Sequence, residues 1–338
     1  MLDGAIVCHP IPIPPRRASS LSSVVLFLAV CFVAFTNGAN ANFKGVASLY
    51  GSGTTTRRQA LWWGTGMTLA GSLAAMLLAE GLLRKFSGRG IVPDDLAQSP
   101  PFLSAVAIGA ALTSFLATRV GFPVSTTHAL VGALLGAGLA GTGTDVRFAA
   151  IGKQFLYPLF FSPAVAMALA AVVYPLLRTL RLAPDHGTRS LNALHFLSTG
   201  GASFARGLND TPKMVALLLV SPDVDLRWGY LAVAALIAAG GLLDADRVAE
   251  TLGKNVTGMD PGQGFAASLV TAGLVTTASL HSLPVSTTHV SVGALLGMGA
   301  VTRQAKWRKV GEILVAWIST LPCGAVLAAL AYMLLSRL

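Results

Sequence analysis

The chain has 338 residues, of which 54% are hydrophobic and only 11% are charged, and its mean hydropathy is +0.68. Soluble globular domains carry roughly a quarter charged residues, so this composition excludes an ordinary soluble domain and predicts an all-α protein that crosses the membrane many times. The net charge of +10 lies in short loops between apolar runs, where lipid headgroups account for it, so no nucleic-acid partner is expected.

Residues 1–21 are rich in proline and match no membrane span, so we expect a disordered tail or an over-extended gene start. A signal peptide over 16–41 is an alternative interpretation, but part of that segment recurs later in the chain, which assigns it to the folded protein. Ten apolar segments follow, and we expect each to form a transmembrane or re-entrant helical element. They cover residues 22–50, 60–83, 102–119, 122–140, 149–178, 193–221, 227–245, 264–281, 283–300 and 309–335.

A polar cluster interrupts the first apolar segment just after Gly38 and the sixth just after Gly207. At an offset of 169, Gly-Ala-Asn-Ala-Asn-Phe-Lys (38–44) aligns with Gly-Leu-Asn-Asp-Thr-Pro-Lys (207–213). Polar groups at such depth are costly, so they usually line a pathway, and a helix broken there would also expose backbone carbonyls. We therefore predict two sets of site residues. The substrate-binding set is Asn40, Lys44, Asn209 and Lys213, and the coupling-ion set is Asn42, Asp210 and Thr211.

Charged side chains near these clusters have alternative interpretations. Arg206, beside the second cluster, is a further candidate for anion binding. Glu80 and Glu250, at an offset of 170, are candidates for the coupling-ion site, although interfacial pairing with nearby basic residues explains them as well. The two lysines could instead extend from interfacial turns to lipid headgroups.

The fourth and ninth segments open with the same six residues, Pro-Val-Ser-Thr-Thr-His, at 123–128 and 284–289. Residues 121–138 and 282–299 agree at thirteen of eighteen positions, at an offset of 161. A proline in the first turn followed by hydroxyl residues predicts a helix N-terminus whose N–H groups and hydroxyls receive an anion. The hydroxyls could instead only cap their helices. The predicted substrate-binding hydroxyls belong to Ser125, Thr126, Thr127, Ser286, Thr287 and Thr288.

The residues after these hydroxyls extend the duplicated unit. His128 and His289 lie one helical turn into it, where each is either a hydrogen-bonded packing residue or part of a proton relay. The glycines at 132, 136, 138, 293, 297 and 299 are expected to permit close helix contacts in lipid.

The two halves share one order of elements, which predicts a single integral membrane domain made of two repeats. Residues 22–178 form the first repeat, 179–192 a linker loop and 193–338 the second repeat. Five elements per half is an odd number, so the second repeat would insert upside down relative to the first, with broken helices and a site at the repeat interface. Lys and Arg divide almost evenly between the two predicted sides, which leaves the orientation open.

Sequence motifs of catalysis are absent: there is no His-Glu-x-x-His, no nucleophile elbow and no phosphate-cradling Walker loop. The cysteines at 8, 31 and 323 have neither metal-ligand spacing nor a disulfide pattern. We therefore expect no enzyme, no cofactor and no bound metal other than Na⁺ as a coupling ion. A passive anion channel is the alternative to an active transporter.

The doubled Pro-Val-Ser-Thr-Thr-His and the Gly-Ala-Asn-type clusters resemble the inorganic phosphate transporter (PiT) family of phosphate and sulfate permeases, over residues 22–335. The resemblance implies an inverted-repeat secondary transporter that moves phosphate with Na⁺ or H⁺. The family's Gly-Ala-Asn-Asp signature falls on residues 38–41 with Ala41 in place of the acid, whereas the second copy keeps Asp210. Because one of two paired acids is lost, we expect weak Na⁺ dependence and coupling to H⁺, and we predict that Ala41→Asp increases Na⁺ dependence.

We expect phosphate as the substrate, with sulfate as the alternative. Both are tetrahedral oxyanions, but a site that offers a hydrogen-bond acceptor such as Asp210 favours protonated phosphate, while an all-donor site suits sulfate. The protein is expected in the cell membrane (inner or plasma), in contact with the lipid bilayer. Its assembly is open, a homodimer being one form.

Overall fold

The computed structural model describes residues 20–220 and 225–337. The tail expected over residues 1–21 therefore lies outside the described residues up to position 19, and the first helix begins at Ser20. The described residues form helices and connecting turns, with two isolated β-bridges, so the all-α expectation is confirmed.

The helices fall close to the ten apolar segments. The first half contains α1 (Ser20–Ala41), η1 (Asn42–Gly45), α2 (Ala47–Gly51), α3 (Arg57–Leu78), α4 (Glu80–Lys85), α5 (Asp94–Ala97), α6 (Pro100–Arg119), α7 (Thr126–Thr142), α8 (Phe148–Ile151), η2 (Gly152–Leu156) and α9 (Tyr157–Thr179). The second half contains α10 (Arg189–Val215), η3 (Ala216–Leu218), α11 (Leu226–Asp244), α12 (Asp246–Glu250), η4 (Thr251–Asn255), α13 (Pro261–Leu280), α14 (Thr287–Val301) and α15 (Trp307–Leu335).

Within the described ranges, seven helices are long and apolar enough to cross a membrane. A span needs about 20 residues, whereas α7 has 17 and α14 has 15, so these two reach only part of the way. The 27-residue α10 is not among the seven, and its last turns carry the polar cluster from Arg206 to Lys213. Seven of the ten expected membrane elements therefore have a helix that can span the membrane, and full crossing by α7, α10 and α14 is not confirmed.

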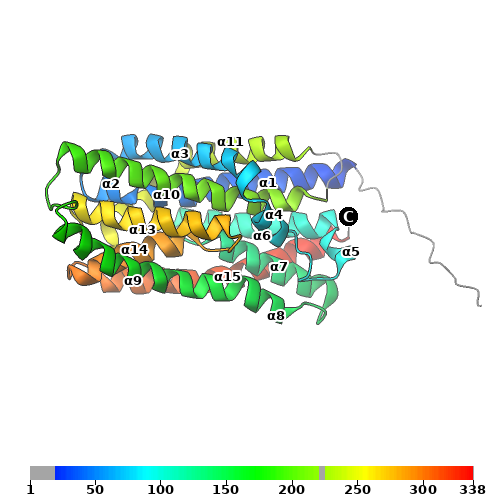
Figure 1. Ribbon diagram of the computed structural model, residues 1–338. Coiled ribbons are helices and arrows are strands. Elements are labelled where there is room, and N and C mark those ends of the chain that lie inside the picture. The colour runs from blue at the N-terminus through cyan, green and yellow to red at the C-terminus, as the bar shows by residue number, and fades with distance from the viewer. Residues whose placement is uncertain (1–19, 221–224, 338) are drawn as a thin grey trace, which may run out of the picture.

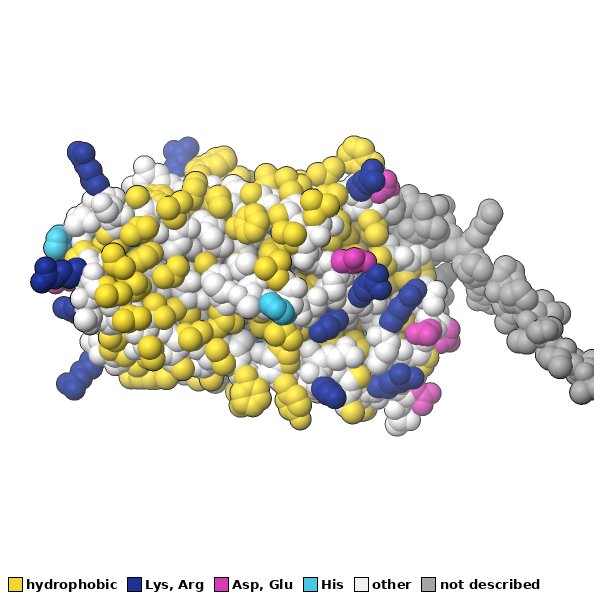
Figure 2. All heavy atoms as spheres, viewed as in Figure 1, with side chains coloured by type: hydrophobic (Ala, Val, Ile, Leu, Met, Phe, Trp, Pro, Cys, Tyr) yellow, Lys and Arg dark blue, Asp and Glu magenta, His cyan; other side chains and the backbone are white. Residues whose placement is uncertain are grey.

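The helices run roughly along one long axis (Figure 1). Figure 2 shows one face of this bundle, with apolar side chains over its body and most charged side chains towards its two ends. Large apolar side chains such as Phe160 and Ile318 are about three-quarters exposed, at 75% and 76%. Such a surface fits lipid around the body and water at the ends, as in an integral membrane protein.

Helix pairings in one half recur in the other with the partners exchanged. In the sequence, α1, α3, α6, α7 and α9 correspond to α10, α11, α13, α14 and α15. α10 packs on α3 and α1 packs on α11; likewise, α7 packs on α15 and α14 on α9. Within each half, α1 packs on α6 and α10 on α13. The two halves are thus interleaved, and each completes the packing of the other.

Glycines allow the motif helices to approach their partners closely, as the sequence predicts. A Cβ atom at Gly132 or Gly136 of α7 would overlap the backbone of Leu321 or Ala325 in α15. At the equivalent place, a Cβ atom at Gly293 or Gly297 of α14 would overlap the backbone of Pro163 or Met167 in α9. Only a hydrogen side chain permits this approach.

Two local predictions need correction. The motif prolines do not occupy the first helical turn: Ser125 and Ser286 are the N-caps, so Pro123 and Pro284 precede the helices. Only the first polar cluster breaks its helix, since α1 ends at Ala41 and the chain continues as the 3₁₀ turn η1. In the second cluster α10 continues to Val215, with Pro212 inside the helix.

Candidate functional site

The two copies of the six-residue motif meet at the N-termini of α7 and α14. Ser125 Oγ accepts a hydrogen bond from the backbone N–H of His128 (3.1 Å), and Ser286 Oγ accepts one from that of His289 (3.2 Å). These two serines therefore cap their own helices. The threonines reach across instead: Thr127 Oγ1 donates to the carbonyl oxygen of Val285 (3.4 Å), and Thr288 Oγ1 donates to that of Val124 (2.9 Å).

The Lys44 ammonium group is held by three oxygen atoms, which we call the first nest. These are the Val124 carbonyl oxygen (2.7 Å), Thr288 Oγ1 (2.6 Å) and Asn40 Oδ1 (3.3 Å). Lys44 is only 3% exposed, so its side chain does not extend to the lipid headgroups. The nest draws on the first half for Asn40 and Val124 and on the second half for Thr288.

The Lys213 ammonium group occupies an equivalent second nest. Its ligands are the Val285 carbonyl oxygen (3.1 Å), Thr127 Oγ1 (2.7 Å) and Asp210 Oδ1 (3.2 Å). The Val285 and Thr127 contacts repeat those of Val124 and Thr288 in the first nest with the two halves exchanged. Asp210 is the difference, because the corresponding position in the first half is Ala41.

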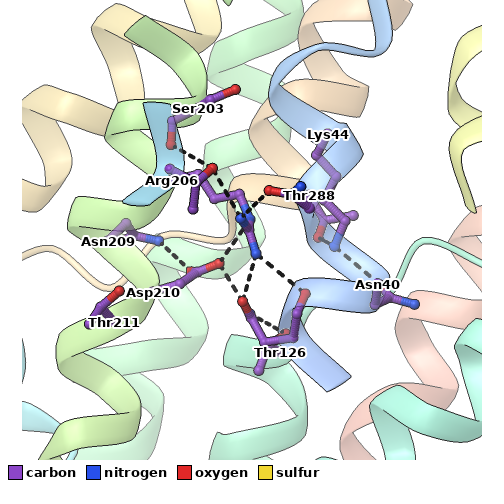
Figure 3. Close-up of polar contacts among 12 residues, drawn as sticks. Asn40, Lys44, Thr126, Ser203, Arg206, Asn209, Asp210, Thr211 and Thr288 are labelled. Carbon is purple, nitrogen blue, oxygen red and sulfur yellow. Dashed lines mark hydrogen bonds and ion pairs between the residues drawn. The ribbon is translucent and has the colours of Figure 1, made fainter. Parts of the chain in front are cut away.

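Asp210, a ligand of the second nest, lies one turn from Arg206 on α10 (Figure 3). Arg206 Nε is 3.8 Å from Asp210 Oδ2, which also accepts a hydrogen bond from Asn37 Nδ2 (3.3 Å). Asn209 Nδ2 donates to Asp210 Oδ1 (3.1 Å). The Arg206 guanidinium further donates to Asn37 Oδ1 (2.7 Å) and Asn42 Oδ1 (3.2 Å). The Arg206 side chain is 1% exposed.

The cluster contains more positive than negative charge. In their ordinary charge states, Lys44, Arg206 and Lys213 are cations and Asp210 is the one carboxylate that the described residues place among them, which leaves an excess of two positive charges. No carboxylate of the described residues ion-pairs with Lys44, and Arg206 Nε has no hydrogen-bond acceptor there. Buried charges are costly unless they are compensated, so this arrangement is suited to a small dianion.

Asn40 and Asn209 connect the polar clusters to the loops before the motifs. Asn40 Nδ2 donates to Thr118 Oγ1 (3.0 Å) and to the Phe122 carbonyl oxygen (2.9 Å), and Asn40 Oδ1 accepts from the Val124 N–H (3.0 Å). Asn209 Nδ2 donates to the Val285 carbonyl oxygen (3.2 Å), and Asn209 Oδ1 accepts from Ser279 Oγ (3.4 Å). Both asparagines thus fix the carbonyl-bearing loops that form the nests.

The remaining predicted hydroxyls have separate contacts. Thr126 Oγ1 accepts from Asn37 Nδ2 (2.9 Å) and joins the Asp210 group. Thr211 Oγ1 donates to Ser72 Oγ of α3 (2.7 Å), so it faces away from the nests. Thr287 is buried at the start of α14, and its hydroxyl has no hydrogen-bond partner in the described part of the chain.

Glu80 and Glu250 lie outside the cluster. Glu80 is exposed on α4 and pairs with Arg84 (2.7 Å), and Glu250 is exposed at the end of α12. Neither acid contacts the nests.

The two motif histidines lie next to each other, with ring centroids 4.5 Å apart. The His289 ring also stacks on Trp317 at 3.8 Å and contacts the Leu159 carbonyl oxygen through Nδ1 (3.2 Å). These contacts describe packed side chains, and a role for His128 and His289 in proton relay stays a prediction.

The sequence analysis missed Asn37 and the α3 hydroxyls. Asn37 bridges Asp210, Thr126 and Arg206. Thr68 Oγ1 accepts from Arg206 (3.2 Å), and Thr65 Oγ1 accepts from Asn42 Nδ2 (2.6 Å). A signal for Asn37 existed, because it stands at the same offset of 169 from Arg206 as the rest of the duplicated cluster. The threonines carried none, since single hydroxyls are common in membrane helices.

Comparisons with known proteins agree with this architecture. The sequence model of the Phosphate transporter family matches residues 37–191 and again residues 184–328, so one match falls on each half. A Rhizobium meliloti (strain 1021) protein named "Probable low-affinity inorganic phosphate transporter" is 31% identical over 329 residues, which cover 91% of this chain and 95% of the relative. A Bacillus subtilis (strain 168) protein of the same name is 24% identical, with coverage of 93% and 98%.

A solved structure is similar over nearly the whole chain. It is titled "The sodium-dependent phosphate transporter", and it matches with a TM-score of 0.82 at 20% sequence identity, covering 94% of this chain and 100% of its own. The fold and the relatives define the class, which is a polytopic helical membrane transporter and not an enzyme. The chain belongs to the Phosphate transporter family.

Proposed function

We propose that this protein is a permease for inorganic phosphate that is driven by a proton gradient, with its substrate site beside the two lysine nests. The observation that carries the proposal is the excess of two positive charges in a buried cluster where two helix N-termini meet. A hydrogen phosphate dianion balances that excess, and free N–H groups at helix N-termini add further donors.

Phosphate fits the cluster better than sulfate does, because the cluster also contains acceptors. Asp210, the Val124 carbonyl oxygen and the Val285 carbonyl oxygen can accept a hydrogen bond from a protonated oxyanion. Sulfate has no proton to donate at neutral pH. The names of the relatives, which refer to phosphate, support the same choice.

The nests argue for H⁺ over Na⁺ as the coupling ion. Each nest presents a carbonyl oxygen, a hydroxyl and a side-chain amide or carboxylate oxygen, which is the ligand chemistry that hard cations prefer. A lysine ammonium already occupies each set of oxygens. The similar solved structure is titled as a sodium-dependent transporter, but at 20% identity that likeness supports the fold alone.

The two nests support a site at the interface of two inverted repeats, because each takes oxygens from both halves. Transport would then proceed by movement of one repeat against the other around the nests. The bacterial relatives support the cell membrane as the location.

The test is uptake of radiolabelled phosphate and sulfate into proteoliposomes under imposed pH or Na⁺ gradients. We expect accumulation of phosphate with an acidic exterior, collapse of that accumulation by a protonophore, and no stimulation by a Na⁺ gradient. Accumulation driven by Na⁺ and indifferent to pH contradicts proton coupling. Equilibration without accumulation identifies a passive channel.

Replacement of a nest lysine gives a sharper version of this test. Lys44→Ser leaves three oxygens without their ammonium group, so uptake should fall without Na⁺ and recover in part when Na⁺ is added. Lys153→Ser changes an exposed lysine outside both nests and serves as the control. Loss of uptake in Lys44→Ser with no response to Na⁺ contradicts the idea that the Lys44 ammonium group takes the place of a metal cation in the first nest.

A further inference from the structure

A second buried polar group lies to one side of the nests and is not used in the proposed substrate site. His195, near the start of α10, is fully buried, and both of its ring nitrogens have hydrogen-bond partners. Nε2 is 2.9 Å from Ser48 Oγ of α2, and Nδ1 is 3.2 Å from Thr54 Oγ1 of the following loop. Ser48 Oγ also contacts Ser268 Oγ of α13 (2.6 Å).

One end of this network meets a small cavity beside Lys44. The cavity has a volume of about 10 Å³, which is enough for one water molecule. Its polar lining comes from Lys44, Ser48, Ser268, Thr271 and Ser291. Ser291 Oγ donates to the Lys44 carbonyl oxygen (2.9 Å). The cavity therefore connects the residue of the first nest with the two serines that lead to His195.

The other end of the network lies near the bundle end that contains α2 (Figure 1). Thr54 Oγ1 contacts Ser52 Oγ (2.7 Å), both side chains are half-buried, and Gly53 between them is exposed. Continuous hydrogen bonds thus run from a water-accessible loop through the imidazole to Ser48 and Ser268.

Five polar side chains of this network and cavity have apolar counterparts in the other half. At the offset of 169, His195 and Ser48 correspond to Leu26 and Leu217, and at the offset of 161 Ser268 corresponds to Ala107. The remaining lining residues Thr271 and Ser291 correspond to Ala110 and Leu130. All five counterparts are buried members of one apolar cluster. The repeat fold therefore packs well without these polar groups, which are costly at membrane depth unless they have a function.

We propose that His195, Ser48, Thr54 and a water molecule in the cavity carry protons between the α2 end of the bundle and the region of Lys44. This inference rests on the proposed function, since it supplies a route for the coupling proton. Imidazole suits the task because one nitrogen can accept a proton while the other releases one, so the ring ends with no change in charge. On the inward step a proton enters at Nδ1 from the Thr54 side, and a proton leaves Nε2 for Ser48 Oγ, which passes its own hydroxyl proton to the cavity water. The ring is then neutral in its other tautomer, and a flip of the ring, which exchanges the two nitrogens, prepares it for the next proton.

The surroundings of His195 leave this transfer unopposed by fixed charge. The groups that face the ring are the hydroxyls of Ser48 from α2 and Thr54 from its loop, and the backbone of Gly264 from α13. Among the described residues, no acidic or basic side chain ion-pairs with His195. Lys44 also lines the cavity, and its backbone carbonyl oxygen accepts the hydrogen bond from Ser291 there.

The experiment compares two activities of the full-length protein in proteoliposomes. Net uptake of radiolabelled phosphate under a pH gradient requires proton movement, whereas phosphate–phosphate exchange at equal pH does not. His195→Leu installs the residue of the other half, and His195→Gln keeps hydrogen bonding but cannot relay protons. We expect net uptake to fall at least about tenfold in both variants, as general acid–base groups contribute that much or more, with exchange retained. His186→Gln, on the exposed 179–192 loop, is the control and should leave both activities unchanged.

Other outcomes overturn the proposal in distinguishable ways. Equal loss of uptake and exchange in His195→Gln, with a normal gel-filtration profile, assigns His195 a structural role only. Unchanged net uptake in both variants shows that the coupling proton takes another route. Failure of the unmodified protein in both assays removes the proposed function itself, and with it this inference.

Discussion

Asp210 faces two cations at once, and its environment fixes it in one orientation. Lys213 approaches one carboxylate oxygen at 3.2 Å, and Arg206 approaches the other at 3.8 Å. Asn209 and Asn37 each donate to one of the same two oxygens. Because removing one partner of a buried ion pair leaves the other charges uncompensated, this carboxylate should be among the most sensitive positions of the protein.

The substitution Asp210→Asn is expected to abolish phosphate uptake and to lower the free energy of unfolding of the phosphate-free protein by about 3–5 kcal/mol. Added phosphate should restore part of the lost stability, because the dianion supplies negative charge to the same cations. Melting temperatures in detergent, measured with and without phosphate, test both statements. The exposed Asp145→Asn serves as the control, and normal uptake by Asp210→Asn would show the prediction to be wrong.

Ala41 is buried at the position that corresponds to Asp210, three residues before Lys44. With Lys44 present, Ala41→Asp should pair with its ammonium group and reduce the excess positive charge, so phosphate affinity should fall, by about tenfold for each 1.4 kcal/mol lost. The sequence alone predicts that Ala41→Asp increases Na⁺ dependence, but the Lys44 ammonium group already occupies the nest that the new acid would join. Greater Na⁺ dependence is therefore expected only in the double variant Ala41→Asp with Lys44→Ser, in which the acid joins an emptied nest. Phosphate titrations of uptake at several Na⁺ concentrations distinguish these cases, and a single Ala41→Asp variant that becomes Na⁺-driven would refute this dependence on Lys44.

At this scale the duplicated sequence predicted which residues correspond, but not which residues touch. The alignment paired Lys44 with Lys213 and Asn40 with Asn209, and all four lie in or beside the nests. The exchange of Thr288 and Thr127 between halves depends on how the halves interleave, which no local periodicity contains. Glu80 at the start of α4 and Glu250 at the end of α12 lie outside the cluster, so their assignment to a coupling-ion site stays a prediction.

At the scale of helices, α7 and α14 position the site because their N-termini are held by close contacts with α15 and α9. The sequence predicted these contacts from glycines four residues apart in an apolar helix. It did not predict that α10 continues through its polar cluster, since the signals for a break are nearly the same in the two copies. Pro212, which favoured a break, lies inside α10 without ending it.

The substitutions Gly136→Ala and Gly297→Ala test this close packing. Each added methyl group would meet backbone atoms of the partner helix, which cannot move aside as a side chain can. We expect each to cost about 1–3 kcal/mol of stability, which is typical of overpacking. The readout is thermal unfolding in detergent followed by fluorescence-detected gel filtration. Gly66→Ala in α3, where nothing lies within 4 Å of the added atom, should be neutral or slightly stabilising, and an equal loss there would remove the argument.

At the scale of the whole molecule, the corresponding helices α3 and α11 of the two halves run in opposite directions. Arg57 at the start of α3 is 3.5 Å from Asp246, which follows the end of α11, so these corresponding helices are antiparallel. The 19 residues of α11 rise about 28 Å, which is close to the thickness of a bilayer's hydrocarbon core. If both helices cross the membrane, their starts lie at opposite surfaces, which is the arrangement that the proposed inverted repeat predicts.

Cysteine labelling decides whether the second repeat is inverted in the membrane. Arg58 is the second residue of α3, and Arg227 lies two residues after Asp225, the N-cap of α11. Both arginines are exposed, and they correspond at the offset of 169. Arg58→Cys and Arg227→Cys, each in a background without the native cysteines, leave both N-caps intact. A membrane-impermeant maleimide added to sealed cells should label only one of the two, and the other should react only after permeabilisation. In an inverted repeat, the starts of α3 and α11 lie on opposite sides of the membrane. Labelling of both cysteines from the same side would therefore rule out inverted repeats, and with them a site formed at their interface.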